Sequence, residues 1–407
     1  MQLRHLTDDD VTDAAGVFVT SLGHQPPKDG ERFKRYWDVG TSLGAFDDDG
    51  RVLGVAARFP ARFTAVGGAE LACTAVPSVG VRPDAHRRGI GRALLERQVT
   101  EAVEHGDALM ALNASEVQIY GRFGYGPTST WWSVEADPRT LTWRDDAPRA
   151  APGSIEEVDP ETAHGLLPDL HERCMGRWGG ELSRHDGWWF AAMQQRPDKP
   201  TPTIAVHRDA DGQVDAVARY VVSQAFDDVG FANKVDLHDL FGVDPATEAL
   251  LLRWLLERRL VGKFTADRLD PRSPVKWMLD DGRRLRTTSA EDAVWVRVLD
   301  VSLAVSARTT LAAAGEVVVG ITDPLVPSND GAWRLAADGN GGLTCAPTDA
   351  PPAVSLDIQL LAPLLWGFAA PSRLAAAGRV EVSDPDGLAV LDRLLAVTEP
   401  SWCSTGF

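Results

Sequence analysis

The spacing of hydrophobic residues changes several times within the first 130 residues. Thr7 to Asp10 combines short polar caps with carboxylates, which favours a helix start, and we expect that helix to run to about Leu22. From Gly89 the apolar spacing becomes helical, with a stop expected at Gly106. The apolar face of this second helix holds Ile90, Ala93, Leu94, Val99, Ala102 and Val103. Alternating or β-branched stretches predict strands over residues 42–46, 51–62, 71–81 and 108–114. This order predicts an α/β layer fold.

The rest of the chain predicts two further regions. Residues 147–153, rich in Ala and Pro, are expected to form a linker. Beyond it, the stretch Gly50-x-Val52-x-Gly54 is echoed by Gly212-x-Val214-x-Ala216, which either a duplicated module or two unrelated hairpins would explain. A helix is expected over 245–260. From about Trp295 a separate α+β domain is expected, with strand-like runs at 294–299, 316–321 and 333–335 and helical runs at 356–368 and 386–395.

Composition narrows the class of protein. A chain of 407 residues is long enough for two or three domains. Its 41 basic and 58 acidic side chains leave a net charge of −17, which argues against nucleic acid or an anionic membrane as the main partner. An acidic surface suits a cationic substrate such as an amine, but solubility alone would also explain it.

The N-terminus and the cysteines indicate a cytoplasmic protein. Residues 1–10 lack an apolar core, so we expect no signal peptide, and no apolar stretch approaches the ~20 residues of a membrane span. Cys73, Cys174, Cys345 and Cys403 are scattered without metal-binding spacing, which predicts free thiols in a reducing compartment. The sequence therefore predicts no metal site.

The stretch from Val79 to Arg92 carries the most specific chemistry. A β-like run passes through Pro83 into a basic loop with Gly89 and Gly91, directly ahead of the amphipathic helix. Glycines let a ligand approach the backbone, and the first amides of a helix favour an anion, so the loop is suited to a pyrophosphate. It matches neither a Walker loop nor the dinucleotide GxGxxG pattern. The alternative is an ordinary strand-to-helix loop with exposed arginines.

A second stretch, Ala114-Ser-Glu-Val-Gln-Ile-Tyr120-Gly-Arg-Phe-Gly-Tyr125-Gly, follows the strand at 108–114. Ser115 and Gln118 form a capping-box pattern, which predicts Ser115 as the N-cap of a short helix containing Tyr120. A phenol is protonated at neutral pH and suits a general acid. Alternatively, Tyr120 packs in the core and Tyr125 is a surface aromatic.

The first stretch resembles motif A of the GNAT N-acetyltransferase superfamily, with its (Arg/Gln)-x-x-Gly-x-(Gly/Ala) loop. That resemblance implies acetyl-CoA as donor, with pantetheine pairing to the strand and pyrophosphate resting on the loop. The implied coenzyme-binding residues are Val79, Gly80, Val81, Arg87, Arg88, Gly89, Ile90, Gly91 and Arg92, with Ser115 and Glu116 beyond. His86 departs from the motif, where Arg or Gln stands first, and implies weaker electrostatic attraction.

The string Ile119-Tyr-Gly-Arg-Phe-Gly-Tyr-Gly126 and the overall plan resemble the Eis (enhanced intracellular survival) family. The resemblance implies tandem GNAT domains followed by a sterol-carrier-protein-like α+β domain. In this chain they would span residues 1–146 (catalytic, binding acetyl-CoA), 147–293 (without the coenzyme loop) and 294–407. It also implies a homohexamer.

The family resemblance further implies two catalytic groups. Tyr120 would be the general acid, and the α-carboxylate of Phe407 would be the general base. Such a carboxylate, with a pKa of about 3.5, is ionised but weakly basic, so geometry would have to supply much of its effect. A frayed chain end is the alternative.

Together these features predict transfer of acetyl from acetyl-CoA to a primary amine by direct attack, without a metal. An aminoglycoside-like molecule, a polyamine or a lysine side chain would fit. Two departures from the family, Gly406 and the carboxylate-free stretch Ser21 to Gln25, argue against tight aminoglycoside binding. A CoA-binding regulatory protein without turnover and an acyltransferase for longer acyl chains are the alternatives. Trp178, Trp188 and Trp189 would line a pocket or pack between domains.

Overall fold

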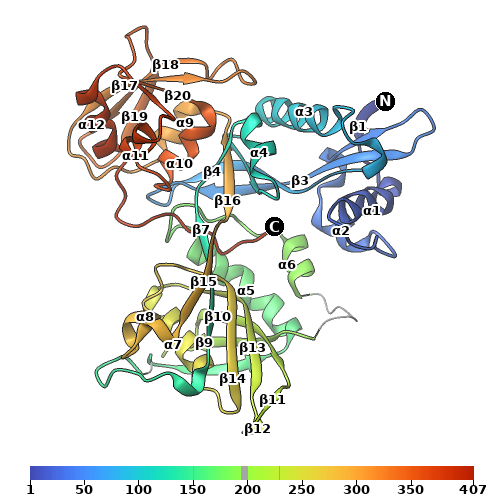
Figure 1. Ribbon diagram of the computed structural model, residues 1–407, viewed down its shortest axis with the longest axis vertical. Helices are drawn as coiled ribbons and strands as arrows, with labels where there is room; N and C mark the ends of the chain where they lie inside the picture. The colour runs from blue at the N-terminus through green and yellow to red at the C-terminus, as the bar shows by residue number, and fades with distance from the viewer. Residues whose placement is uncertain (150, 194–199, 229) are drawn as a thin grey trace. The chain divides into compact units, whose positions relative to one another are not determined.

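A computed structural model describes residues 1–149, 151–193, 200–228 and 230–407. The chain forms two compact units that are interleaved along the sequence (Figure 1). Unit 1 combines residues 1–129, 178–191 and 293–407, and unit 2 combines residues 130–177 and 192–292.

Unit 1 contains a seven-stranded sheet in the order β1-β2-β3-β4-β5-β16-β6. Its strands are β1 (Gln2–His5), β2 (Leu43–Phe46), β3 (Val52–Thr64), β4 (Glu70–Val81), β5 (Leu109–Asn113), β6 (Tyr125–Pro127) and β16 (Val294–Val298). Its helices include α1 (Val11–Ser21), α2 (Glu31–Tyr36), α3 (Ile90–His105) and α4 (Val117–Tyr120). The predicted strands and helices of the first 130 residues are therefore present in the predicted order.

Local chemistry explains where α1 and α3 begin and end. The carboxylate of Asp10 accepts hydrogen bonds from the backbone N–H and hydroxyl of Thr7, both at 2.7 Å, just ahead of α1. α3 begins after Gly89 and ends before Gly106, and both glycines have left-handed φ angles. On the predicted apolar face of α3, Ile90, Leu94, Val99 and Ala102 are buried, Ala93 is half-buried and Val103 is 37% exposed.

Strand β16 is paired far from its sequence neighbours. Val294 to Val298 lies antiparallel to β5, from Asn113 back to Leu109, and its other edge pairs with β6. The strand predicted at 294–299, expected to begin the third region, therefore belongs to the first sheet, between β5 and β6. A sequence pattern predicts a strand but carries no information on this distant partner.

The C-terminal part of unit 1 holds a five-stranded sheet in the order β19-β18-β17-β20-β21. Its strands are β17 (Glu316–Thr322), β18 (Gly331–Ala337), β19 (Leu343–Pro347), β20 (Val354–Asp357) and β21 (Glu381–Val382). The accompanying helices are α9 (Val301–Ser306), α10 (Leu361–Leu365), α11 (Pro371–Ala376) and α12 (Pro385–Leu394). The helix predicted from Leu356 is wrong at its start, because Leu356 pairs with Ile321 in the parallel strands β17 and β20.

Unit 2 contains a second seven-stranded sheet, β15-β7-β14-β13-β10-β9-β8. Its strands are β7 (Thr130–Ala136), β8 (Ser154–Val158), β9 (Thr203–Arg208), β10 (Val214–Ser223), β13 (Asn233–Gly242), β14 (Val261–Leu269) and β15 (Arg286–Asp292). Its main helices are α5 (Pro160–Met175) and α7 (Pro245–Leu256), and α6 (Asp186–Met193) passes from unit 1 into unit 2. The segment predicted as a linker, 147–153, lies within unit 2, and its Ala150 is outside the described residues.

The echo between the two halves has a structural counterpart. Gly50 and Gly212 have φ angles of 80° and 81°, and each stands two residues ahead of a long strand, β3 or β10. A left-handed residue at this point closes an Asp-bearing turn in both units.

Candidate active site

Strand β4 loses one of its neighbours halfway along its length. It pairs with β3 from Glu70 to Val81, but with β5 only from Cys73 to Ala75. Among the described strands, none covers the β5 side of β4 beyond Ala75. Unpaired main-chain groups at a strand edge bind an extended amide chain readily, so residues 76–81 offer such a site.

Two glycines allow helices to pack tightly around the open part of β4. A Cβ at Gly80 would lie 2.8 Å from Cα of Phe18 in α1. A Cβ at Gly54, the β3 partner of Val81, would lie 2.8 Å from a methyl group of Ile90 in α3. Gly80 thus lets α1 pack closely on β4, and Gly54 lets the start of α3 pack closely on β3.

The basic loop, residues 82–89, presents free amides at the start of α3. Arg87 and Gly89 have φ angles of +61° and +77°, and the first helical hydrogen bond runs from the Ala93 N–H to the Gly89 carbonyl at 3.0 Å. The amides of residues 90–92 therefore lack intrahelical acceptors and favour an anion. Space is also available, because a Cβ at Gly89 would meet no atom within 4 Å.

The arginines of this region are not equivalent. Arg87 and Arg88 are exposed, and among the described residues no ion pair involves either of them. Arg92 pairs with Glu96 at 2.8 Å, which reduces the charge it offers to a ligand. His86 contacts the Val81 carbonyl through Nε2 at 3.1 Å and so closes the loop onto the end of β4.

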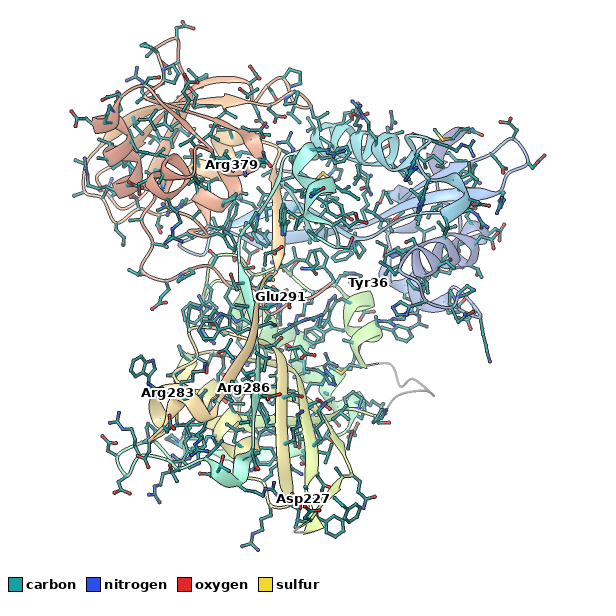
Figure 2. The ribbon with its side chains drawn as sticks, in the orientation of Figure 1. Tyr36, Asp227, Arg283, Arg286, Glu291 and Arg379 are labelled. Atoms are coloured by element: carbon teal, nitrogen blue, oxygen red, sulfur yellow. The ribbon has the colours of Figure 1, made fainter. Side chains whose placement is uncertain are left out.

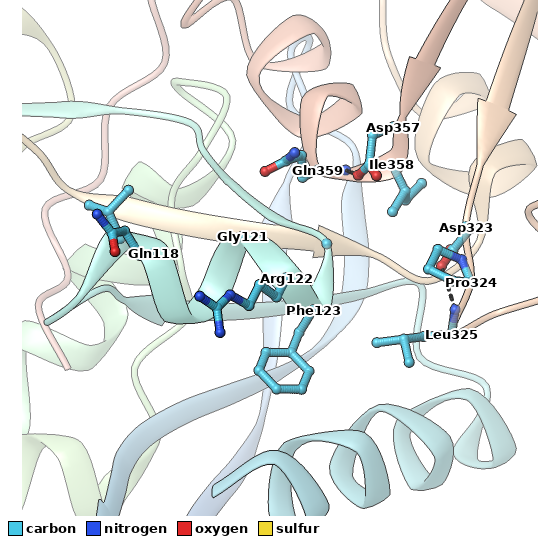
Figure 3. Close-up of a pocket in the computed structure, with 12 residues that line it drawn as sticks. Gln118, Gly121, Arg122, Phe123, Asp323, Pro324, Leu325, Asp357, Ile358 and Gln359 are labelled. Carbon is cyan, nitrogen blue, oxygen red and sulfur yellow. Dashed lines mark hydrogen bonds between the residues drawn. The ribbon is translucent and has the colours of Figure 1, made fainter. Parts of the chain in front are cut away.

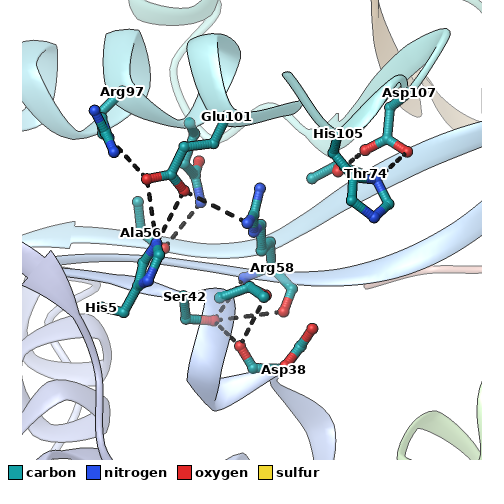
Figure 4. Close-up of polar contacts among 12 residues, drawn as sticks. His5, Asp38, Ser42, Ala56, Arg58, Thr74, Arg97, Glu101, His105 and Asp107 are labelled. Carbon is teal, nitrogen blue, oxygen red and sulfur yellow. Dashed lines mark hydrogen bonds and ion pairs between the residues drawn. The ribbon is translucent and has the colours of Figure 1, made fainter. Parts of the chain in front are cut away.

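Helix α3 is also fixed through a buried carboxylate (Figure 4). Glu101 is hydrogen-bonded by Arg97 at 2.7 Å and by His5 at 3.1 Å, and its other neighbour is Arg58 of β3 at 3.4 Å. Burial raises the pKa of Glu101, but these cationic and hydrogen-bonding partners outweigh that effect and hold the pKa below its usual value. The charged cluster joins α3 to β1 and β3.

Tyr120 lies beside the open part of β4. Its side chain is 7% exposed and packs in one cluster with Val76 and Val79. Burial raises the pKa of its phenol, and a hydrogen bond with the Ser115 side chain partly opposes that rise. The phenol is therefore protonated at neutral pH.

One expectation about this stretch, and part of its alternative, are wrong. Helix α4 begins at Val117 with Glu116 as N-cap, so Ser115 does not cap it and bonds to Tyr120 instead. Tyr125 is completely buried rather than a surface aromatic, and its hydroxyl contacts the Met110 sulfur at 3.6 Å. Because α4 begins at Val117, Ser115 lies one residue before the N-cap position, and its side chain does not cap the helix.

The glycines of the Tyr120 string are required by packing. A Cβ at Gly126 would lie 2.0 Å from the Gln359 carbonyl oxygen, and one at Gly121 would lie 3.0 Å from the amide oxygen of Gln359. A cavity of about 320 Å³ adjoins this contact, and Arg122 and Phe123 project from the string beside it (Figure 3). Its opposite wall comes from residues 323–325 and 357–359.

The terminal segment, residues 401–407, is held by a clamp segment, residues 178–188. Glu181 accepts hydrogen bonds from the Ser404 N–H and the Thr405 hydroxyl, both at 2.9 Å. Arg184 donates to the side-chain oxygens of the same two residues, also at 2.9 Å. Residues 401–405 are buried, so the chain end is ordered rather than frayed.

In the described structure, each of the last two residues makes one main-chain hydrogen bond. Trp188 donates from Nε1 to the Gly406 carbonyl at 3.0 Å, and the Phe407 N–H donates to Oδ1 of Asn113 at 3.0 Å. The role of Trp188 is therefore to hold the terminal segment.

Aromatic rings surround the chain end. The Phe407 ring meets Phe59 edge-on at 6.1 Å, and Phe59 lies 4.4 Å from His185 and 5.5 Å from Tyr36, between ring centroids. Tyr36, at the end of α2, is marked in Figure 2. Burial lowers the pKa of His185, which keeps the imidazole neutral at neutral pH.

Sequence patterns did not point to Asn113, Glu181, Arg184 or His185. In the sequence, Asn113 looks like the polar end of a buried strand, and the other three lie in the clamp segment, which belongs to unit 1. The one available signal was the cluster of tryptophans at 178–189.

The described ranges contain no candidate metal-ligand cluster and no candidate membrane helix. There, no group of three or more His, Cys, Asp or Glu side chains is placed to hold a metal ion. No helix in the same residues has the length and apolar character needed to cross a membrane.

Comparison with known proteins places this site in a family. Residues 2–128 and 180–298 each match an acetyltransferase (GNAT) domain, and residues 301–404 match a sterol carrier protein domain. The N-acetyltransferase Eis of Mycobacterium tuberculosis is 30% identical over 358 residues, which are 86% of this chain and 84% of that protein. The chain belongs to the Eis family of GNAT N-acetyltransferases.

Other relatives agree with this assignment. An uncharacterized N-acetyltransferase of Streptomyces avermitilis is 33% identical over 373 residues, covering 90% of this chain and 88% of the relative. The crystal structure of Eis1 from Mycobacterium abscessus matches over the full length of both chains with a TM-score of 0.87 and 25% identity. The predicted family, the fold of two GNAT domains plus a sterol-carrier-like domain, and the enzyme class are confirmed. The boundaries at 146 and 293 stay predictions.

Proposed function

We propose that this Eis-family enzyme transfers the acetyl group of acetyl-CoA to a primary amine by direct attack. The observation that carries the proposal is the open edge of β4 leading into the free amides at the start of α3. Pantetheine amides would pair with Val79 to Val81, and the pyrophosphate would bind the amides of residues 87–92. Arg87 and Arg88 would add attraction for the phosphates.

The chemical step needs one proton acceptor and one proton donor. The Phe407 carboxylate would take a proton from the ammonium of the acceptor, and the amine nitrogen would then attack the thioester carbon. Backbone amides near Val79 would polarise the carbonyl. As the C–N bond forms and the C–S bond breaks, Tyr120 would give its proton to sulfur. The nitrogen would lose its second proton as the amide forms, which would restore the Tyr120 phenol directly or through water, and the proton on the carboxylate would pass to solvent. The burial and protonated state of Tyr120 support this role. No step requires a metal.

Two variants test these roles together. Tyr120→Phe removes the proton donor, and one or two residues added after Phe407 displace the carboxylate. We expect each to lower kcat by roughly 100-fold or more while acetyl-CoA binding changes little. Tyr125→Phe is the matched control, because Tyr125 is a fully buried neighbour outside the reaction. Unchanged turnover in the extended enzyme would remove the terminal carboxylate from the mechanism.

The two alternative functions are separable by assay. A CoA-binding protein without turnover would bind acetyl-CoA yet acetylate no polyamine, lysine peptide or aminoglycoside. An acyltransferase for longer chains would prefer propionyl- or longer acyl-CoA donors over acetyl-CoA. The family resemblance also predicts a homohexamer, and the N-terminus and scattered cysteines predict a cytoplasmic location. Native mass spectrometry and cell fractionation would check these two predictions.

A further inference from the structure

Asn113 connects the end of strand β5 to the end of the chain. Its Oδ1 accepts the Phe407 N–H at 3.0 Å, and its Nδ2 donates to the Ala293 carbonyl at 2.9 Å. The second bond fixes the orientation of the amide, because the nitrogen faces Ala293 and only the oxygen remains for Phe407. Within the described residues, Asn113 is the residue that holds the main chain of Phe407.

The position of Asn113 in the sheet gives this contact its importance. The last residue of β5 that pairs with β4 is Ala111, so Asn113 lies two residues into the divergent part of the strand. That part faces the open edge where the thioester would lie. Immediately after it, Ser115 bonds to Tyr120, so the same stretch also orients the proposed acid.

Among the described residues, the other hydrogen bonds of the terminal segment stop short of Phe407, whose ring packs against Phe59. Glu181 and Arg184 grip residues 404 and 405, and Trp188 holds the carbonyl of Gly406. Packing of the Phe407 ring fixes the side chain, and the hydrogen bond from the Phe407 N–H to Asn113 is what fixes the main chain next to the terminal carboxylate. Asn113 is neutral, so it positions the terminal carboxylate without adding a like charge beside it.

We propose that Asn113 is a positioning residue for the Phe407 carboxylate. In this proposal, β5 and the turn after it orient both the proposed base, the Phe407 carboxylate, and the proposed acid, Tyr120. This inference rests on the proposed function. It assigns to Asn113 an effect on turnover rather than on coenzyme binding, since its side chain contacts the chain end and β16 instead of the basic loop.

The test is a double-mutant cycle in the full-length enzyme. Asn113→Leu keeps the side-chain size and removes both hydrogen bonds, and we expect kcat to fall roughly 10- to 100-fold with the KM for acetyl-CoA within about twofold. In the enzyme extended beyond Phe407, the carboxylate is already displaced, so Asn113→Leu should lower kcat almost no further. Asn233→Leu in unit 2 is the control for loss of an asparagine and should leave kcat unchanged.

The outcomes separate the inference from the proposed function. If the extension abolishes turnover but Asn113→Leu does not reduce kcat, or if the two losses multiply, Asn113 does not act through Phe407. If the extension itself does not change turnover, the Phe407 carboxylate is not the general base, and the proposed function is contradicted before the inference about Asn113 is reached. Should Asn113→Leu fold poorly, Asn113→Ser provides the same cycle with a smaller side chain that is too short to reach Phe407. Hydrogen exchange at the Phe407 amide, expected to accelerate in either variant, gives a readout independent of turnover.

Discussion

The guanidinium of Arg297 donates two hydrogen bonds to the carboxylate of Asp323, at 2.6 and 2.7 Å, and both side chains are completely buried. Arg297 lies on β16 in the first sheet, and Asp323 follows β17 of the C-terminal sheet. Asp323 also accepts a hydrogen bond from Asn329 at 3.0 Å. The pair therefore joins the two sheets of unit 1, and Arg297 lies next to Gly124 of the string that carries Tyr120.

Removing one partner of this pair should be strongly destabilising. Asp323→Ala leaves an unpaired guanidinium in the interior, and we expect the free energy of unfolding to fall by about 3–5 kcal/mol. Glu316→Ala breaks a pair with Arg334 on the exposed face of the C-terminal sheet, where both side chains are over 40% exposed, and should cost below about 1 kcal/mol. Urea denaturation of both variants checks the difference, and equal losses would contradict it.

Gly124 connects this ion pair to the Tyr120 string. Its φ is +83°, and a Cβ there would lie 2.8 Å from Arg297, whereas Gly50 has a φ of +80° and open space around it. Gly50→Ala should therefore cost only the backbone strain, about 1–2 kcal/mol. Gly124→Ala adds crowding, for a total of about 2–5 kcal/mol, and should lower kcat as well. Thermal unfolding and steady-state kinetics of the two alanine variants test this, and a kcat unaffected by Gly124→Ala would argue against coupling to Tyr120.

The basic loop should contribute to coenzyme affinity through charge. Replacing Arg87 and Arg88 together by alanine should raise the KM for acetyl-CoA about two- to thirtyfold, because exposed ionic contacts contribute about 0.2–1 kcal/mol each. The effect should shrink at high ionic strength. Arg283 and Arg284, two adjacent exposed arginines of unit 2, provide the control pair. An equal KM in the Arg87/Arg88 variant at low salt would exclude these side chains from the coenzyme site.

The pH dependence of turnover should reflect the buried phenol. Because burial raises the pKa of Tyr120, the acid form persists through the alkaline range and is lost only as pH rises above about 10. We therefore expect kcat to show no alkaline decline attributable to Tyr120 below that pH. A decline centred near pH 8 in the parent enzyme, absent from the residual activity of Tyr120→Phe, would contradict this assignment.

Sequence patterns predicted those parts of the site that are formed by one continuous stretch of the chain. The basic loop and α3 follow from Gly89, from the apolar spacing after it and from Gly106, which all lie in one continuous stretch. Tyr120 was placed on its short helix, but Ser115 was misassigned because its hydrogen bond goes to a side chain rather than to the helix.

Contacts between distant segments were beyond the reach of such patterns. Nothing near Asn113 indicates that residues 293 and 407 bond to its amide, and nothing in 294–298 indicates a partner 180 residues earlier. Glu181 and Arg184 look like surface charges in the sequence, yet they are buried because the chain end lies against them. These residues were identified only once the fold had brought them together.

The place of β16 in the first sheet has a consequence for biosynthesis. Until residue 298 has left the ribosome, β5 has no neighbour on one side, so an apolar strand edge stays uncovered while about 180 further residues are translated. At elongation rates of roughly 5–20 residues per second this wait lasts on the order of 10–40 s. Exposed strand edges recruit other chains, so the nascent protein is a natural client for chaperones that bind during translation.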